Sequence, residues 1–428
     1  MKSKKTLALW LNHKLPCGLV RPPIQFMKTL LILGAGTAGT MMANRLRKRL
    51  TAEEWKITIV DEDSTHYYQP GFLFMPFGIY SQEDVIKPKR HFIPGGVDYL
   101  GAEVDRVEAE KNRVLLRSGQ HLKYDVLIIA TGVKIAPEQT EGMLGSDWGT
   151  RVFDFYTFEG ASALHHALRA WNGGRLVVHI TETPIKCPVA PLEFAFLADR
   201  WLIDSRLRDK TEIVYVTPGS GAFTEPIAAK VLGHLLEEKR IKVVTDFNVD
   251  RVDNDRHKIV SWDGKEVDYD LLVTVPSNTG DVAMGRSGLG DERNFVATNR
   301  HTLQSKQHPN IFALGDSTNL PSPKSGSMAH FQSEVLTENI LRHIQGEALE
   351  SQPDGHADCF VESWHANASR LDFNDDLQTA EEKYLLPVMG ACSLLHETRL
   401  NQFSKLALRW IYGTCGSEVC LCRELALR

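Results

Sequence analysis

The sequence has little of what marks a membrane-spanning, nucleic-acid-binding or disulfide-stabilised protein. No apolar run reaches the roughly 18 residues needed to read as a membrane span. The 49 Lys and Arg are outnumbered by 54 Asp and Glu, so the chain has no general attraction for nucleic acid. Seven cysteines in 428 residues are too sparse for a disulfide scaffold, and their number is odd. No C-x-x-C-H motif occurs, so no haem is expected to be attached to this chain.

What is present is an ordinary globular composition and enough chain for two or three domains. Residues 1–26 contain no clean apolar core and no small-residue cleavage site of a secretory signal. We therefore predict that they form an extension outside the fold, and that the fold begins at Met27. A targeting role for this segment is a less favoured alternative.

A glycine-rich motif follows the first predicted strand. The apolar run 29–33 leads directly into G-x-G-x-x-G and then a helical stretch, 40–50. In this context the first glycine makes the turn, the second lets a pyrophosphate approach the backbone, and the third lets the helix pack on the strand. A second strand, 56–60, ends in a carboxylate pair placed to meet the hydroxyls of an adenosine ribose. The predicted dinucleotide-binding residues are Gly34, Gly36, Thr37, Ala38, Gly39, Asp61 and Glu62.

Two later segments favour FAD over NAD as the nucleotide bound there. One apolar strand ends in Ala130-Thr131-Gly132, where small residues let the chain pass close to a cofactor. Another ends in Gly315-Asp316 and is followed by Lys324-Ser325-Gly326 and a helix from about Met328. The aspartate can accept a hydrogen bond from a ribityl hydroxyl, while the helix N-terminus and Lys324 place positive charge at the flavin ring. The predicted FAD-binding domain spans residues 27–150 and 285–345.

A second Rossmann-like unit is predicted over residues 151–284, with its nucleotide site degenerate. Strands are expected at 175–180 and 212–216, and helices at 191–201 and 227–238. The turn after the first of these strands, 181–188, has no glycine, and Glu182 would repel a phosphate. Binding of NAD(P)H to this unit is therefore disfavoured. The predicted fold class is α/β, with two Rossmann-like domains followed by a C-terminal α-helical segment, 346–428.

Cys187 lies at the entrance of a predicted helix in place of the missing glycines. Pro188 suits the first helical turn, and a thiol at a helix N-terminus is shifted toward the nucleophilic thiolate. The alternative is a buried structural thiol, which is a common fate of a free cysteine. Because the glycines that NADH would need are absent, the reactive thiol is the favoured interpretation.

The sequence resembles sulfide:quinone oxidoreductases and the flavin subunit of flavocytochrome c sulfide dehydrogenases. The motifs that carry the resemblance are Gly34–Gly39, His66-Tyr67-Tyr68-Gln69-Pro70, Cys187–Glu193, Gly315-Asp316 with Lys324-Ser325-Gly326, and Ala357–Val361. The resemblance implies that Cys187 and Cys359 form a redox-active pair that receives sulfide. A further cysteine, often attached to the flavin in that family, is absent from residues 151–156, which implies non-covalent FAD.

The resemblance implies an enzyme that oxidises sulfide to sulfane sulfur and reduces a quinone. Three alternatives stay open: a type II NADH:quinone oxidoreductase, the flavin subunit of a sulfide dehydrogenase, and a non-catalytic flavoprotein that senses or scaffolds sulfur transfer. Glu193, His179 and His330 are candidate proton handlers, although a lone residue of these types is more often structural.

The C-terminal region carries one amphipathic stretch and several unassigned cysteines. Residues 398–412 place apolar side chains at helical spacing, with Arg399, Lys405 and Arg409 beside them, a pattern typical of a helix at a membrane interface. Packing on the protein's own core or on a sister subunit is the alternative. With the resemblance, we expect a monotopic protein on the cytoplasmic face of a membrane, a quinone partner and a homo-oligomer. The spacing of Cys415, Cys420 and Cys422 matches no common metal site, so no metal is predicted.

Overall fold

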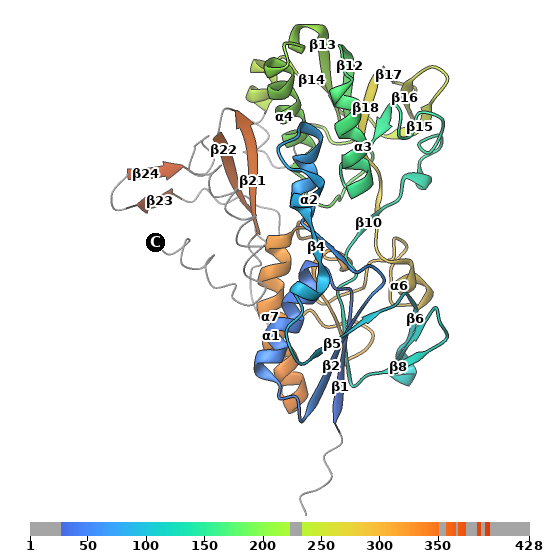
Figure 1. The fold of residues 1–428 in the computed structure, drawn as a ribbon, viewed down its shortest axis with the longest axis vertical. Helices are drawn as coiled ribbons and strands as arrows, with labels where there is room; N and C mark the ends of the chain where they lie inside the picture. The colour runs from blue at the N-terminus through green and yellow to red at the C-terminus, as the bar shows by residue number, and fades with distance from the viewer. Residues whose placement is uncertain are drawn as a thin grey trace, which may run out of the picture.

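The computed structural model describes residues 27–222 and 233–350, together with the backbone of four strands between residues 357 and 393. It contains two parallel sheets of five strands, one above the other in Figure 1, each flanked by helices or small antiparallel sheets. The predicted α/β fold with two Rossmann-like units is confirmed. The expected extension, 1–26, and the amphipathic stretch, 398–412, lie outside the described residues.

The first sheet is built from short apolar runs that are buried on both faces, as parallel strands require. Ile32 lies opposite Ile59 on one side and Ile128 on the other, and all three side chains are fully buried. In spatial order the strands are β20 (Ile311–Ala313), β9 (Val126–Ile129), β1 (Lys28–Leu33), β2 (Trp55–Asp61) and β5 (Val97–Gly101).

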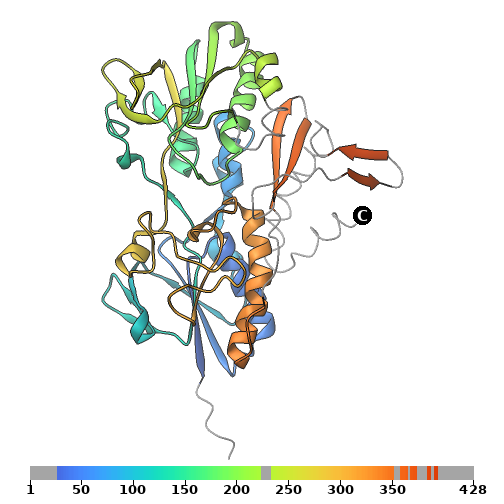
Figure 2. The same ribbon diagram turned by 180° about the vertical axis from the view of Figure 1, so that it is seen from behind.

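Two long helices cover one face of this sheet. They are α1 (Thr37–Arg49) and α7 (Gly326–Gln345), which lie side by side in Figures 1 and 2. Leu46 of α1 and Leu336 of α7 share a buried cluster with Ile32. The other face is covered by α6 (Val282–Arg286) and by an antiparallel sheet of β6 (Val104–Glu108), β7 (Arg113–Leu116) and β8 (His121–Lys123).

The second sheet repeats this architecture from a different part of the chain. Its order is β11 (Val152–Phe153), β18 (Leu271–Val275), β12 (Gly174–Ile180), β13 (Thr211–Val216) and β14 (Lys242–Val244). Helices α3 (Phe158–Arg169) and α4 (Ala190–Asp204) pack on one face. The antiparallel strands β15 (Val249–Asp253), β16 (Lys258–Ser261) and β17 (Glu266–Asp268) pack on the other.

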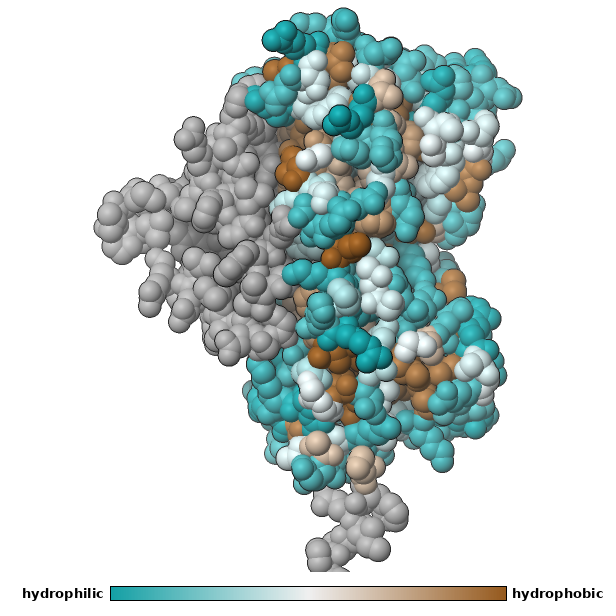
Figure 3. Space-filling view, in the orientation of Figure 1, coloured by the Kyte–Doolittle hydropathy of each residue, from teal (hydrophilic) through white to brown (hydrophobic). Residues whose placement is uncertain are grey.

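Short segments join the two units. One antiparallel pair is β10 (Lys134–Ile135) with β19 (Asn278–Thr279). Another is β3 (Thr65–Tyr67) with β4 (Ile86–Pro88). Helix α2 (Gln82–Val85) lies between β3 and β4 in sequence. The apolar run after β3 crosses to the second unit, where the Phe77 and Phe194 ring centroids are 5.0 Å apart. On the face shown in Figure 3, hydrophobic residues form only small, separate patches among the described residues.

Beyond α7, where a helical segment was predicted, the described backbone forms two hairpins. They are β21 (Ala357–Trp364) with β22 (Asn367–Phe373), and β23 (Lys383–Leu386) with β24 (Gly390–Ser393). Strand β21 lies against both α4 and α7 (Figure 1), so it contacts a helix of each unit.

Several element boundaries differ from those expected. Helix α1 begins at Thr37 rather than residue 40, and α7 begins at Gly326 rather than Met328, because each glycine-containing loop passes directly into its helix. Helix α4 extends three residues further than expected, to Asp204. Of the predicted helix 227–238, only residues 233–238 are described, and these are helical.

Candidate active site

The glycine loop between β1 and α1 has the geometry of a nucleotide cradle. Gly34 has φ of +94°, and a Cβ atom there would lie 2.3 Å from the Ala130 carbonyl oxygen. A Cβ on Gly39 would lie 1.9 Å from the Gly34 carbonyl oxygen, so both positions require glycine. Gly36 caps α1, and a Cβ there would meet no atom within 4 Å. The open space is therefore at the glycine where a pyrophosphate would approach the helix N-terminus, with Thr37 and Ala38 in its first turn.

Asp61, at the end of β2, faces this loop. Its Oδ2 accepts a 2.6 Å hydrogen bond from the Ala35 N–H, and its Oδ1 accepts one of 2.6 Å from Lys89 Nζ. Glu62 points elsewhere: its carboxylate is about half exposed and pairs with Lys134 at 3.2 Å. The structure therefore brings Asp61, rather than Glu62, to the predicted ribose position.

The strand β9 delivers a second small-residue loop to the same edge of the sheet. The Ala130 N–H donates to the Leu33 carbonyl at 2.8 Å, which holds this loop beside the glycine loop. The Thr131 hydroxyl is buried with no hydrogen-bond partner among the described residues. Gly132 has φ of +72° and open space at its Cα. An unpaired buried hydroxyl beside open space fits a polar ligand, as FAD would provide.

The loop between β20 and α7 supplies the remaining predicted residues. Gly315 has φ of +66°, and its N–H donates to Gln332 Oε1 at 2.7 Å. Lys324 Nζ donates to the carbonyls of Asp316 and Thr318, at 3.1 and 2.7 Å. The lysine therefore links the two ends of the loop of which it is a part. Burial lowers the pKa of the Lys324 ammonium to about 8.

The same loop ends at the start of α7. Ser325 caps α7 by accepting a hydrogen bond from the Met328 N–H at 3.2 Å, and Gly326 is the first helical residue. Burial raises the pKa of the Asp316 carboxyl, against the opposing charges of Lys324 and Lys186. Asp316 is thus placed beside two cations near the helix N-terminus, where the flavin half of FAD was expected.

Cys187 is brought to this loop from the second unit. Its N–H donates to the Lys324 carbonyl at 2.8 Å, and its own carbonyl accepts from the Ala190 N–H at 2.9 Å and from the Tyr156 hydroxyl at 3.2 Å. The residue has φ of +49°, an uncommon conformation for a non-glycine residue and one that concentrates at functional sites. The side chain is partly exposed. These contacts hold the predicted reactive cysteine against the predicted flavin-binding loop.

The helix entrance differs in detail from the prediction. Helix α4 starts at Ala190 with Pro191 in its first turn, so Pro188 is not a first-turn residue and lies before the N-cap, Val189. The first-turn position was assigned to the wrong proline because two prolines, three residues apart, both fit it. Cys187 still lies just before the helix, within the field of its N-terminus.

Two residues beside Cys187 were not identified from the sequence. Lys186 donates from its backbone to Asn278 Oδ1 and from Nζ to Gln69 Oε1, both at 2.8 Å. Its Nζ lies 5.5 Å from the ring centroid of Tyr156. Burial lowers the pKa of Lys186, while negative charge on Asp316, Cys187 or Asp154 would raise it. A cation next to the thiol favours its thiolate form.

Tyr156 lies in the segment 151–156, where the resemblance led us to consider only a cysteine. Its ring is buried, and burial raises the pKa of its hydroxyl far above the ordinary value, so it stays protonated as a donor to the Cys187 carbonyl. An aromatic residue next to the predicted site was a signal that could have been followed.

The second predicted cysteine, Cys359, lies in β21, where its backbone pairs with Leu371 of β22. Its side chain is outside the described residues. The backbone places β21 along α4, which Cys187 precedes, and along α7, which Lys324 precedes.

The three candidate proton handlers have different environments. His179 is fully buried in β12, and desolvation lowers its pKa to about 3, so it is neutral at ordinary pH. Burial also lowers the pKa of His330, which lies 3.9 Å from Glu334. Glu193 is buried in the first turn of α4, close enough to Tyr156 to influence its pKa. Of the three, Glu193 is the acid next to the cysteine site.

The degenerate turn of the second unit carries a partly exposed ion pair. Glu182 pairs with Arg293 at 3.1 Å. Among the residues that the structure describes, no group of His, Cys, Asp or Glu could hold a metal ion. No helix within the described ranges is long and apolar enough to cross a membrane.

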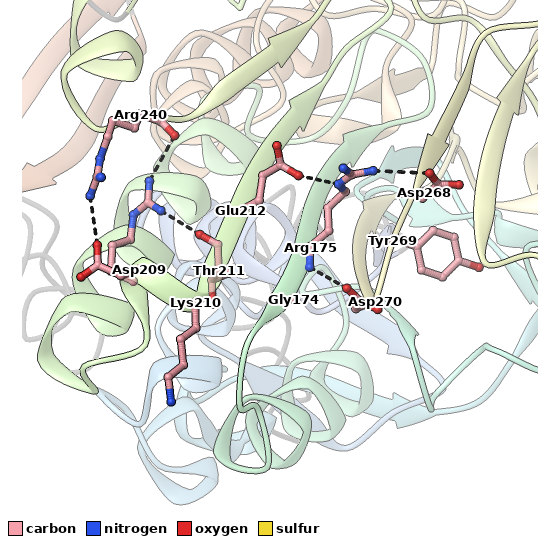
Figure 4. Close-up of a pocket in the computed structure, with 11 residues that line it drawn as sticks. Gly174, Arg175, Asp209, Lys210, Thr211, Glu212, Arg240, Asp268, Tyr269 and Asp270 are labelled. Atoms are coloured by element: carbon pink, nitrogen blue, oxygen red, sulfur yellow. Dashed lines mark hydrogen bonds and ion pairs between the residues drawn. The ribbon is translucent and has the colours of Figure 1, made fainter.

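A surface pocket of the second unit lies away from these residues (Figure 4). It is formed where β12 and β13 begin, and several of its charged groups pair with one another: Arg175 Nε lies 2.6 Å from Glu212, and the Arg175 N–H donates to Asp270 at 2.7 Å. Ligands of parallel α/β sheets bind at the opposite, carboxyl ends of the strands. We therefore assign no part of the reaction to this pocket.

The glycine loop, the loop after β9, the loop before α7 and the adjacent cysteine together define a flavin-dependent oxidoreductase with two Rossmann-like units. The chain belongs to the pyridine nucleotide-disulphide oxidoreductase family, whose sequence profile it matches over residues 28–333. Its cofactor is FAD, as predicted. When bound, FAD would supply a two-electron acceptor, and the glycine loop, Asp61, Thr131 and Asp316 are the residues that would hold it.

Within this family, the chain is similar to sulfide:quinone oxidoreductases, which confirms the resemblance seen in the sequence. It is 25% identical to the mitochondrial enzyme of Dictyostelium discoideum, over 86% of this chain and 85% of that protein. It is 26% identical to the mitochondrial enzyme of Mus musculus, over 82% and 79%. The crystal structure of the Aquifex aeolicus enzyme matches with a TM-score of 0.76 at 20% identity, covering 91% of each chain. A type II NADH:quinone oxidoreductase of Staphylococcus aureus is 22% identical over 76% of this chain and 85% of that protein.

Proposed function

We propose that this protein oxidises sulfide to sulfane sulfur and passes the electrons through FAD to a quinone, using Cys187 and Cys359 as a redox pair. The observation that carries the proposal is the hydrogen bond from the Cys187 N–H to the Lys324 carbonyl, 2.8 Å long. It fixes a cysteine of one unit against the loop that enters the flavin-facing helix of the other. The relatives named above support the choice of substrate and acceptor.

The proposed chemistry begins with hydrosulfide attacking a Cys187–Cys359 disulfide. The S–S bond breaks, one cysteine becomes a persulfide and the other leaves as a thiolate. Overall, hydrosulfide loses a proton and two electrons as its sulfur becomes sulfane sulfur, and the electrons pass to FAD and then to the quinone. Further rounds would lengthen the sulfur chain until a polysulfide leaves.

The residues around Cys187 would assist by holding charge. Lys186 and the N-terminus of α4 favour a thiolate at Cys187, while Tyr156 fixes the backbone that carries it. Glu193 is the proposed proton acceptor, since it is a carboxyl close to Tyr156 and to the start of α4. FAD is proposed to be held without a covalent bond, because residues 151–156 include no cysteine.

The decisive experiment mixes the oxidised, purified protein anaerobically with sulfide or with NADH and follows the flavin absorbance. Sulfide should bleach the flavin, and a short-chain ubiquinone analogue should restore its colour. Cys187→Ser and Cys359→Ser should each lose sulfide-dependent bleaching, whereas Cys392→Ser, the matched control, should retain it. Bleaching by NADH and not by sulfide would instead identify the second candidate, a type II NADH:quinone oxidoreductase.

We further propose that the protein binds a membrane surface through residues 398–412, on the cytoplasmic face, and forms a homo-oligomer there. The support is the amphipathic pattern and the quinone acceptor, which is confined to membranes. Replacing Leu400, Phe403 and Trp410 together by Ser should abolish co-flotation with liposomes of anionic phospholipid. Unchanged flotation of that variant would refute this assignment.

A further inference from the structure

Lys89 is a buried lysine that the chemistry described so far does not use. It lies in a short 3-10 turn, Lys89–His91, directly after β4, and its N–H donates to the Ser64 carbonyl at 2.8 Å. Its side chain is 7% exposed, and its Nζ lies 2.6 Å from Oδ1 of Asp61, whose side chain is 15% exposed. We infer that Lys89 is a positioning residue for the adenosine half of FAD, because it orients and neutralises the carboxylate that faces the nucleotide loop.

The hydrogen bonds of Asp61 leave its carboxylate a single orientation. Oδ2 accepts from the Ala35 N–H at 2.6 Å, and Oδ1 accepts from the Asp63 N–H at 3.0 Å in addition to Lys89. Ala35 lies between the first two glycines of the cradle, so the carboxylate is fastened to the loop that a diphosphate approaches.

The charge of Lys89 matters because FAD carries a diphosphate. In the Rossmann fingerprint an acidic side chain meets the ribose, within a few ångströms of the phosphates. A buried carboxylate without a counter-charge would repel them, and removing one partner of a buried ion pair leaves an uncompensated charge. Lys89 removes this repulsion while leaving Oδ2, which among the described residues accepts only from the Ala35 N–H, able to accept a further hydrogen bond from a ribose hydroxyl.

The neighbouring histidine completes the arrangement. His66 packs against Phe92 with ring centroids 4.2 Å apart, and its Nδ1 is buried without a partner among the described residues. Burial first, and then the charge of Lys89, lower its pKa to about 4. The Asp61–Lys89 ion pair and the neutral ring of His66 therefore lie together at this end of the cradle. Asn44 of α1 donates to the Phe92 carbonyl at 2.8 Å, which ties the segment to the helix that opens at Gly36.

The test measures FAD release from purified holoenzyme after dilution, through the fluorescence of free FAD. Lys89→Met should release FAD at least tenfold faster than the wild type, since Asp61 loses its counter-charge. Lys89→Arg keeps the charge and should stay within about threefold of the wild type. Lys87→Met is the matched control, because Lys87 is exposed on the same segment, and its release rate should be unchanged.

A second comparison separates neutralisation from a merely structural role. In the double variant Lys89→Met/Asp61→Asn the uncompensated carboxylate is gone, so FAD release should return to the rate of Asp61→Asn alone. Additive acceleration in the double variant would overturn the inference. So would Lys89→Arg releasing FAD as fast as Lys89→Met, or Lys89→Met releasing it at the wild-type rate. If Lys89→Met fails to fold, Lys89→Gln takes its place in the same comparisons.

Discussion

His179 offers a test of whether a buried histidine in the second unit is structural or takes part in proton transfer. The ring lies in the centre of the sheet, where Nδ1 is 3.0 Å from the Thr274 hydroxyl and Nε2 has no partner within the described part of the chain. Desolvation lowers its pKa from 6.5 to about 3. We predict that His179→Leu changes the pH dependence of stability and leaves the sulfide reaction at neutral pH intact.

The magnitude follows from proton linkage. Below pH 6.5 the unfolded chain takes up a proton on this histidine, while the folded protein does not until about pH 3. The free energy of unfolding is therefore unaffected by the titration of this histidine above pH 6.5. Below that pH it falls by about 1.4 kcal/mol for each pH unit. At pH 5 the wild type should have lost about 2 kcal/mol through His179. Loss of the Thr274 hydrogen bond in the variant adds a pH-independent offset of about 1 kcal/mol.

The assay is urea unfolding of the holoenzyme at pH 7.5 and pH 5, followed by circular dichroism. Between these two values, the variant should lose about 2 kcal/mol less stability than the wild type. His66 titrates in both proteins and cancels in the comparison, and His301→Leu, on the surface, should behave as the wild type. Equal losses in wild type and variant would refute the desolvation argument. A large drop in sulfide-dependent bleaching at pH 7.5 would return His179 to the proton-transfer candidates.

Three further outcomes are expected. Gly36→Ala should fold normally, because its Cβ meets no protein atom, yet hold FAD at least tenfold more weakly; a flavin-to-protein ratio equal to wild type would contradict this. Arg208→Met should lose about 3 kcal/mol in denaturant unfolding, since the buried Asp199 carboxylate loses the cation 2.6 Å away and keeps Lys239 at 3.5 Å; a loss below 1 kcal/mol would count against it. Lys186→Met should slow iodoacetamide alkylation of reduced Cys187 about tenfold at pH 7, and an unchanged rate would exclude the charge effect.

The first unit was largely predictable because its signals are local. The buried run of β1, the glycines after it and the acid that ends β2 follow one another in sequence, and each has a steric or electrostatic reason to be there. Boundaries were less accurate, as at Thr37 and Ala190, because a loop that continues into a helix has no residue type that marks the change. The sequence likewise does not show which of Pro188 and Pro191 lies in the first turn of α4.

Lys89 could not be predicted, because its role depends on a contact with Asp61 across the fold. A lysine after a short strand usually points to solvent, and nothing in its sequence neighbourhood distinguishes it from the exposed Lys87. Burial and pairing arise only when β4 pairs with β3, the strand that follows β2 in sequence. The position of Lys186 could not be predicted for the same reason, because its Nζ donates to Gln69, which belongs to the other unit.

The hydrogen bond between Cys187 and Lys324 joins two sites that were predicted separately from the sequence. Each residue was recognisable alone, one as a cysteine in place of glycines and the other as part of a loop before a helix. Their backbones bond because the second sheet places the turn after β12 against the loop after β20 of the first. A nucleotide-binding turn requires glycine so that a phosphate can reach the backbone, whereas here another protein loop reaches it instead. In the proposed function this contact positions the Cys187 thiol, so the same fold would serve a different electron donor.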